Sequence, residues 1–101
     1  MRTFSQRCYD VLRNVPTGRV TTYAEIARAL HTCAYRAVGQ AMHRNPRAPS
    51  VPCHRVVASD GSLGGFASGP EAKIRLLRME GVEVKGGRIV DFKKVFYPLG
   101  V

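Results

Sequence analysis

The sequence predicts an α+β domain: a small, mainly helical and winged-helix-like unit with a helix-turn-helix and one or two short β-hairpins. Three observations carry this prediction. A chain of 101 residues can close one modest core, so residues 1–101 are expected to form a single domain. Two capping boxes are each followed by apolar residues at helical spacing. Near the end, residues 82–90 flank a Gly86-Gly87 pair, which is typical of a hairpin turn.

The first two helices are both expected to begin at a capping box. Thr3 with Gln6 forms the first box, and apolar residues then recur at helical spacing until a Pro-Thr-Gly segment at 16–18. Thr22 with Glu25 forms the second box, which opens a short helix.

A third helix is predicted over residues 34–44, because a proline follows Asn45 and stops it. Together with the second helix it is a candidate helix-turn-helix, although many small helical domains contain such a pair. Its two faces differ: the apolar one holds Ala37, Val38, Ala41 and Met42, and the outward one holds Arg36, Gln40, His43 and Arg44, with Gly39 beside them. We expect the basic face to contact DNA, with an ordinary solvated face as the alternative.

The charge balance favours a polyanionic partner. The 16 Lys and Arg residues against 7 Asp and Glu leave a net charge of +9, and the pI is near 10.2. Such a charge in a folded domain fits nucleic acid better than a membrane surface. We expect neither a signal peptide nor a membrane span.

The cysteines indicate a reducing compartment. Cys8, Cys33 and Cys53 are odd in number and widely spaced, which is neither a disulfide framework nor a set of zinc ligands. We therefore expect the cytoplasm or, in a eukaryote, the nucleus. We expect no metal site and no cofactor.

A final helix is expected to begin at Pro70 and to end before Gly81. Leu76, Leu77 and Glu80 share one of its faces, so the Glu80 carboxylate is expected to point towards the core, where the leucines point. A carboxylate on an apolar face needs a partner, because an unpaired charge is costly to bury.

The stretch Pro52-Cys53-His54-Arg55 carries the most chemistry. It places a soft nucleophile beside a proton acceptor and a permanent positive charge, and the thiolate is the reactive form of cysteine. With Glu80, these residues supply a nucleophile, a base and a group that orients the base. Neighbours in an extended segment point to opposite sides, so His54 would reach Cys53 through a water molecule or a bend.

Other interpretations of this stretch stay open. Cys53 alone could be a buried structural thiol, and His54 alone could be a satisfied core histidine. A cysteine hydrolase is another hypothesis, although no Asn or Asp stands out as an orienting residue. A zinc site is not expected, because the cysteines and histidines lack metal-like spacing.

The motif from Pro52 to Val56 resembles the active-site motif of the 6-O-alkylguanine–DNA alkyltransferases. Further stretches that match this family at matching spacing are 16–23, 36–39, 45–46, 64–73 and 76–81. The resemblance covers nearly all of the chain and corresponds to the family's C-terminal domain, which binds DNA and carries the active site. The family's usual N-terminal domain is not expected in this chain.

The resemblance implies a role for each residue of the candidate active site. Cys53 would accept the alkyl group in one irreversible displacement, His54 would take the thiol proton through water, and Glu80 would orient His54. Asn45 would brace the active-site loop. Tyr23 would press on a phosphate and promote flipping of the damaged nucleotide, which must leave the stack before a buried thiol can reach it.

The same resemblance implies a DNA-binding set and a base pocket. The residues that would contact DNA, from the minor-groove side, are Thr22, Tyr23, Arg36, Ala37, Gly39, Gln40, Arg44 and Ser59, with Arg36 entering the stack in place of the flipped nucleotide. The residues that would line the base pocket are Met42, Val56, Phe66, Ala67, Ser68 and Lys73, with Lys73 holding the loop that covers it. The partner would be double-stranded DNA containing alkylated guanine, and we expect a monomer.

The sequence departs from the family pattern at several points. Phe66 stands where a tyrosine is common, Ala67-Ser68 replaces a frequent Ser-Gly pair, and Thr32-Cys33 is atypical in its turn. Short alkyltransferase-like relatives bind alkylated DNA without repairing it, and their acceptor cysteine is replaced. The length and tail of this chain resemble that group, whereas Cys53 resembles the true transferases.

The leading hypothesis is stoichiometric, self-inactivating alkyl transfer to Cys53. The alternative is a non-catalytic lesion-binding protein that recruits another repair pathway. A third hypothesis is a domain that acts only with a separate partner, which would supply the missing N-terminal half.

Overall fold

The structure is a computed structural model that describes residues 3–46, 50–64 and 69–99. In chain order its elements are α1 (Phe4–Leu12), β1 (Thr21–Thr22), α2 (Tyr23–Ala29), α3 (Tyr35–His43), the 3-10 turn η1 (Cys53–Arg55), β2 (Val56–Val57), α4 (Pro70–Met79), β3 (Val84–Lys85), β4 (Arg88–Ile89) and α5 (Phe92–Val95). This mixture of helices and short strands is the predicted α+β class, and α2 with α3 forms the helix-turn-helix. Among the described residues, no helix has the length and apolar character of a membrane span.

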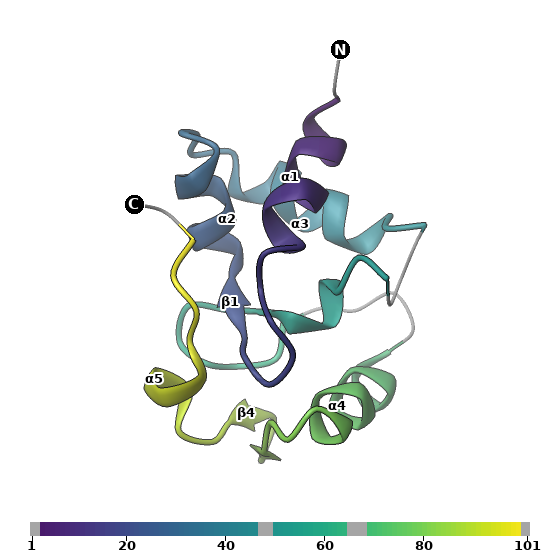
Figure 1. Cartoon of the computed structure of the whole chain (residues 1–101), viewed down its shortest axis with the longest axis vertical. Helices are drawn as coiled ribbons and strands as arrows, with labels where there is room; N and C mark the ends of the chain where they lie inside the picture. Colours follow the sequence, from purple (N-terminus) through teal and green to yellow (C-terminus); the bar gives the residue numbers. More distant parts are fainter. Residues whose placement is uncertain (1–2, 47–49, 65–68, 100–101) are drawn as a thin grey trace.

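The first three helices gather in one half of the molecule (Figure 1). The predicted capping box starts α1, since the Thr3 hydroxyl accepts from the Gln6 amide at 3.1 Å and the Gln6 side chain accepts from the Thr3 amide at 2.9 Å. The buried residues of this half are Cys8, Leu12, Val15, Ile26, Ala27, Val38, Ala41, Met42, Val51, Cys53 and Val56. The helix-turn-helix and Cys53 therefore share one core.

The other half contains α4, the C-terminal hairpin and α5 (Figure 1). β3 and β4 pair antiparallel with Val84 opposite Ile89, and the positive φ angles of Gly86 and Gly87 form the turn that the sequence predicted. The buried residues here are Val20, Val57, Leu63, Leu77, Val82, Val84 and Ile89.

A parallel strand pair joins the two halves. Thr21 of β1 lies opposite Val56 of β2, and Thr22 lies opposite Val57. The sequence predicted only hairpins, and this pair was missed because two-residue strands far apart in the chain show no period-2 pattern. As a result, the start of α2 is fixed beside the residues that directly follow Cys53.

The boundaries of the helices agree with prediction except at α1. That helix ends at Leu12, whereas the apolar spacing predicted helix as far as Val15. Residues 13–15 form a turn instead, and the Val15 side chain still packs into the core. Burial alone therefore explains the apolar Val15, without a further helical turn.

The C-terminal segment returns to the helical half and lies against α2, which the sequence did not predict (Figure 1). The amide of Val20 donates to Val95 O at 2.9 Å, and the amide of Tyr97 donates to Val20 O at 2.7 Å. Further on, the amide of Leu99 donates to Glu25 Oε2 at 2.6 Å. Through these contacts, α5 is held close to the N-terminal end of α2.

Candidate active site

Cys53 and His54 lie in a tight turn rather than in the extended segment that the sequence suggested. The amide of Cys53 donates to Val51 O at 2.8 Å, and the amide of Arg55 donates to Pro52 O at 3.0 Å. Cys53 and His54 are both buried, with 5% and 1% of each residue exposed. The turn supplies the bend that the hypothesis required between a nucleophile and its neighbouring base.

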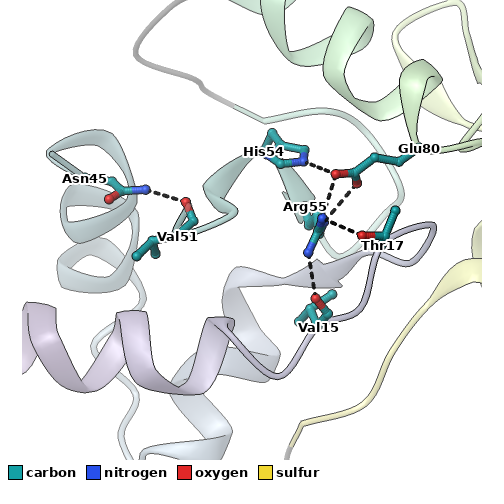
Figure 2. Close-up of polar contacts among 7 residues, drawn as sticks. All are labelled: Val15, Thr17, Asn45, Val51, His54, Arg55 and Glu80. Carbon is teal, nitrogen blue, oxygen red and sulfur yellow. Dashed lines mark hydrogen bonds and ion pairs between the residues drawn. The ribbon is translucent and has the colours of Figure 1, made fainter. Parts of the chain in front are cut away.

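A side chain from the end of α3 fastens the chain just before this turn. Asn45 Nδ2 donates to Val51 O at 2.7 Å (Figure 2). The carbonyl of Val51 thus accepts both from Asn45 and from the Cys53 amide. The position of Cys53 therefore depends directly on the recognition-helix candidate α3.

His54 and Arg55 converge on Glu80, which follows α4 as its C-terminal cap (Figure 2). His54 Nε2 lies 2.9 Å from Glu80 Oε2, Arg55 Nε donates to Oε1 at 2.9 Å, and Arg55 Nη2 donates to Oε2 at 2.6 Å. The Glu80 side chain is 15% exposed, so it lies at the edge of the core rather than deep within it. Arg55 and His54 thus both act as partners of this largely buried carboxylate.

These contacts fix the protonation of the pair. Burial alone would raise the pKa of Glu80, but hydrogen bonds from Arg55 and His54 outweigh burial and hold that pKa below its ordinary value. Burial lowers the pKa of His54, and this outweighs the hydrogen bond and charge of Glu80, which raise it. A neutral His54 facing an ionised Glu80 must donate from Nε2, because a carboxylate is only an acceptor.

The remaining ring nitrogen of His54 is then a lone-pair acceptor. His54 Nδ1 is buried, and no hydrogen-bond partner for it exists among the described residues. A buried, unsatisfied acceptor is unusual and calls for an explanation such as a catalytic role or a bound water. The ring beside Cys53 is thus ready to accept a proton at Nδ1.

Arg55 has a role that the sequence did not reveal. Its Nη1 donates to Val15 O at 2.8 Å, and its Nη2 donates to Thr17 Oγ1 at 3.0 Å, in addition to the two bonds with Glu80 (Figure 2). One guanidinium thereby ties the turn after α1 to the end of α4. The sequence suggested it only as a positive charge near the thiol.

Lys73 of α4 is fully buried on the other side of this segment. Its Nζ donates to Val56 O at 2.6 Å and also to Leu63 O. Desolvation lowers the pKa of Lys73 to about 8, although the nearby Cys53 acts in the opposite direction. Lys73 therefore holds the strand that follows Cys53 to the segment that leads into residues 65–68.

A hollow of about 520 Å³ opens beside Cys53. Its walls are Tyr23, Tyr35, Arg36, Gly39, Met42, His43 and Cys53. Five of these were predicted as site residues, and His43 was placed on the face expected to contact DNA; Tyr35 was not predicted. Tyr35 is 53% exposed, and an exposed aromatic residue directly before Arg36 is the signal that could have identified it.

Tyr23 enters this hollow beside a glycine. Gly64 has a φ of +71°, and a Cβ built on it would lie 2.9 Å from the Tyr23 hydroxyl. A side chain at position 64 would therefore displace Tyr23 or strain the backbone. Tyr23 also lies near Lys73, whose Nζ is 6.0 Å from the centre of its ring.

Two members of the expected base pocket are placed elsewhere. Val56 is fully buried in the core opposite Thr21, and neither it nor Lys73 is among the described residues that line this hollow. Phe66, Ala67 and Ser68 lie outside the described residues. Of the expected pocket residues, the structure brings Met42 to the hollow.

The expected DNA-contacting residues fall into two groups. Arg36, Gln40 and Arg44 are exposed along α3, with Ala37 and Gly39 partly exposed beside them, and Arg44 Nη2 donates to Gln40 Oε1 at 3.1 Å. Thr22 and Ser59 instead line a second hollow, at the N-terminal end of α2. Thr22 is buried there because its hydroxyl caps the helix, accepting from the Glu25 amide at 3.0 Å.

The arrangement suits nucleophilic substitution. In the part of the chain that the structure describes, no three His, Cys, Asp or Glu side chains come together as metal ligands. The thiol of Cys53 faces a hollow, a neutral histidine lies in the same turn, and a carboxylate orients that histidine. The exposed Arg36 lies in the wall of that hollow.

A family model and several known proteins match this chain. The family described as 6-O-methylguanine DNA methyltransferase, DNA binding domain, matches residues 3–82. A methylated-DNA–protein-cysteine methyltransferase of Thermococcus kodakarensis is 52% identical over 79% of this chain and 45% of its own length. This chain spans about half the length, or less, of the curated relatives that it matches first.

Two solved structures with DNA are similar to this fold. The Mycobacterium tuberculosis OGT in complex with DNA is 41% identical over 79% of this chain and 50% of its own, with a TM-score of 0.75. S. pombe Atl1, solved with damaged DNA containing O6-carboxymethylguanine, is 32% identical over 96% of this chain and 98% of its own, with a TM-score of 0.83.

Proposed function

We propose, because the chain belongs to the 6-O-methylguanine DNA methyltransferase family, that it repairs DNA by moving an alkyl group from the O6 atom of guanine to Cys53. The observation that carries the proposal is the turn holding Cys53 and His54, with Glu80 behind the histidine. The transfer would be stoichiometric, since a thioether has no ready route back to the thiol. Such a reaction would take place where DNA is held, in the cytoplasm or in a eukaryotic nucleus.

The proposed step balances without a cofactor. The Cys53 thiol loses its proton to His54 Nδ1, through a water molecule in the bend between the two side chains. The Cys53 sulfur then attacks the alkyl carbon, a carbon–sulfur bond forms, and the carbon–oxygen bond breaks with its electron pair going to the guanine oxygen. The guanine takes up a proton and becomes a normal base, while Glu80 holds His54 in the tautomer that accepts at Nδ1.

The DNA side of the proposal uses the exposed residues of α3. The damaged nucleotide would flip out of the duplex and enter the hollow beside Cys53, because a buried thiol cannot reach an atom inside stacked bases. Arg36, at the edge of that hollow, would fill the space left in the stack, and Tyr23 would press on the neighbouring phosphate. Asn45 would keep Cys53 in register with α3 through its bond to Val51.

A second candidate function is lesion binding without repair. The match to S. pombe Atl1 favours it, because that chain corresponds to this one over 98% of its length and was solved on damaged DNA. Under this proposal the hollow would hold the alkylated base and Cys53 would not react. The presence of Cys53 with its proton acceptor argues for transfer instead.

Intact-protein mass spectrometry tests the two candidates. Incubation with duplex DNA containing 6-O-methylguanine should add one methyl group per protein molecule, on the peptide that contains Cys53. Cys53→Ala should gain no mass and should still bind the lesion, whereas Cys33→Ala, which removes an exposed thiol that does not line the Cys53 hollow, should still gain one methyl group. Tight binding by the wild type without any gain in mass would replace the transfer proposal by the lesion-binding one.

A further inference from the structure

The hollow lined by Thr22 and Ser59 does not contain Cys53. It measures about 770 Å³ and lies between the α2–α3 turn, the Thr22 cap and α5. Tyr35 lines both this hollow and the one beside Cys53, so the two open on either side of a single exposed ring. The first of them is therefore continuous with the surface that the proposed function assigns to DNA.

The charges around this hollow favour an anion. Arg28 and Lys93 lie in its wall, on α2 and α5. The one acidic residue described in the wall is Glu25, whose Oε1 accepts from Arg28 and whose Oε2 accepts from the Leu99 amide. The Arg28 side chain is still 63% exposed after that pairing, so positive charge faces the opening.

The remaining wall suits a sugar and a phosphate oxygen together. Phe92 and Phe96 form an apolar side, with ring centres 5.7 Å apart and tilted by 53°. The Ser59 hydroxyl lies in the same wall and is exposed. Cations and hydroxyls bind phosphate oxygens, while apolar surface can cover a deoxyribose.

We propose that this hollow binds a sugar-phosphate unit of the DNA strand whose damaged nucleotide enters the Cys53 hollow, with Lys93 of α5 and Arg28 of α2 as phosphate ligands. The DNA interface thereby extends from the helix-turn-helix onto the C-terminal segment. The tail bonds to Val20 and Glu25 hold α5 in the position that this contact requires. The inference rests on the proposed binding of DNA and adds a second subsite to it.

Salt dependence of binding provides the test, with a neighbouring lysine as the matched control. Lys93 and Lys94 are both exposed on α5, but only Lys93 lines the hollow. Binding of the full chain to a labelled duplex containing 6-O-methylguanine would be measured by fluorescence anisotropy over a series of salt concentrations. Loss of one phosphate contact should reduce the slope of log affinity against log salt by about 0.9.

Lys93→Ala should show this reduced slope and a weaker affinity at low salt, and Lys94→Ala should keep the wild-type slope. Thermal melting of both variants checks that each is folded. An unchanged slope in folded Lys93→Ala, or an equal reduction in both variants, would overturn the inference while leaving the proposed transfer intact. Failure of the wild type to bind the duplex at all would overturn both.

Discussion

Glu80 and Lys73 both belong to the α4 region and both reach the segment around Cys53, yet they meet it differently. Glu80 meets two side chains that can carry positive charge, Arg55 and His54. Lys73 is more deeply buried and donates to the backbone carbonyls of Val56 and Leu63. The first site pairs a charge with one opposite charge and a neutral imidazole, and the second pairs a charge with dipoles.

This difference determines which of the two groups can change its protonation state at moderate pH. A carboxylate held by a guanidinium stays ionised and resists protonation, so the Glu80 cluster can orient His54 at any moderate pH. A buried ammonium among carbonyls gives up its proton more easily, which is why the pKa of Lys73 falls to about 8. We expect substitutions to separate these two behaviours.

The largest effect should come from breaking the Glu80 cluster. Arg55→Met removes two bonds to Glu80 and the bonds to Val15 and Thr17, and should lower the free energy of unfolding by about 3 kcal/mol, since a half-buried carboxylate loses its charged partner. Denaturant unfolding would measure this change.

The matched control is Arg75→Met, which removes an exposed arginine of α4 and should change stability by less than about 0.5 kcal/mol. A loss in Arg55→Met no larger than that of the control would mean that the cluster does not stabilise the fold.

The next effect should appear in the rate of alkyl transfer. Glu80→Gln removes the negative charge that supports His54 as a base, and should slow single-turnover transfer by about 100-fold, at the low end of the effect of general acid–base catalysis. Affinity for lesion-containing DNA should change less than about threefold, since Glu80 faces the protein interior and its loss removes no phosphate contact.

Glu83→Gln serves as the control for this rate, because Glu83 is an exposed carboxylate near the same end of α4. Equal losses of rate and affinity in Glu80→Gln would assign Glu80 a purely structural role at the end of the helix.

A smaller effect should follow from the low pKa of Lys73. Between pH 8 and pH 9 the unfolded chain keeps the Lys73 proton while the folded chain releases it, so the free energy of unfolding should rise with pH, by about 1 kcal/mol over this unit. Equilibrium unfolding at several pH values would show the rise.

The buried Cys8 thiol acts in the opposite direction within this window. Burial raises the pKa of Cys8 from 9.0 to about 11, so its ionisation in the unfolded chain begins between pH 8 and pH 9 and offsets part of the Lys73 contribution. Lys73→Met should remove the rise between pH 8 and 9. If that variant keeps the wild-type slope, another group is responsible for it.

Much of the fold could be predicted because it depends on local chemistry. Thr3 and Gln6 cap α1, Pro70 starts α4, and Gly86 with Gly87 turns the hairpin, and each of these signals acts within a few residues. The pairing of β1 with β2 could not be predicted this way. Its energy comes from contacts between segments that are distant in the chain.

In the candidate site, too, the features that depend on residue type and local spacing were predicted, and those that depend on distant segments were not. The sequence identified Cys53, His54 and Glu80 because their residue types carry the chemistry, and helical spacing placed Glu80 on the inner face. It did not show that the Arg55 guanidinium would form its ion pair with Glu80, because that pairing depends on where α4 ends. Lys73 was overlooked as a core residue, although it lies four residues before the buried Leu77 and so on the same face.

The parallel pairing of β1 with β2 has a consequence for how the molecule folds. Thr21 and Val56 can meet only after the whole segment between them, including α2 and α3, has been closed into a loop. Closing such a loop costs chain entropy before any contact repays it, so this contact is expected to form late, after the helices. A partly folded chain would then contain its helix-turn-helix but no assembled cysteine site. Amide protons of residues 21–22 and 56–57 should therefore exchange with solvent through this partly folded state, at a lower free energy than the core amides of the helices.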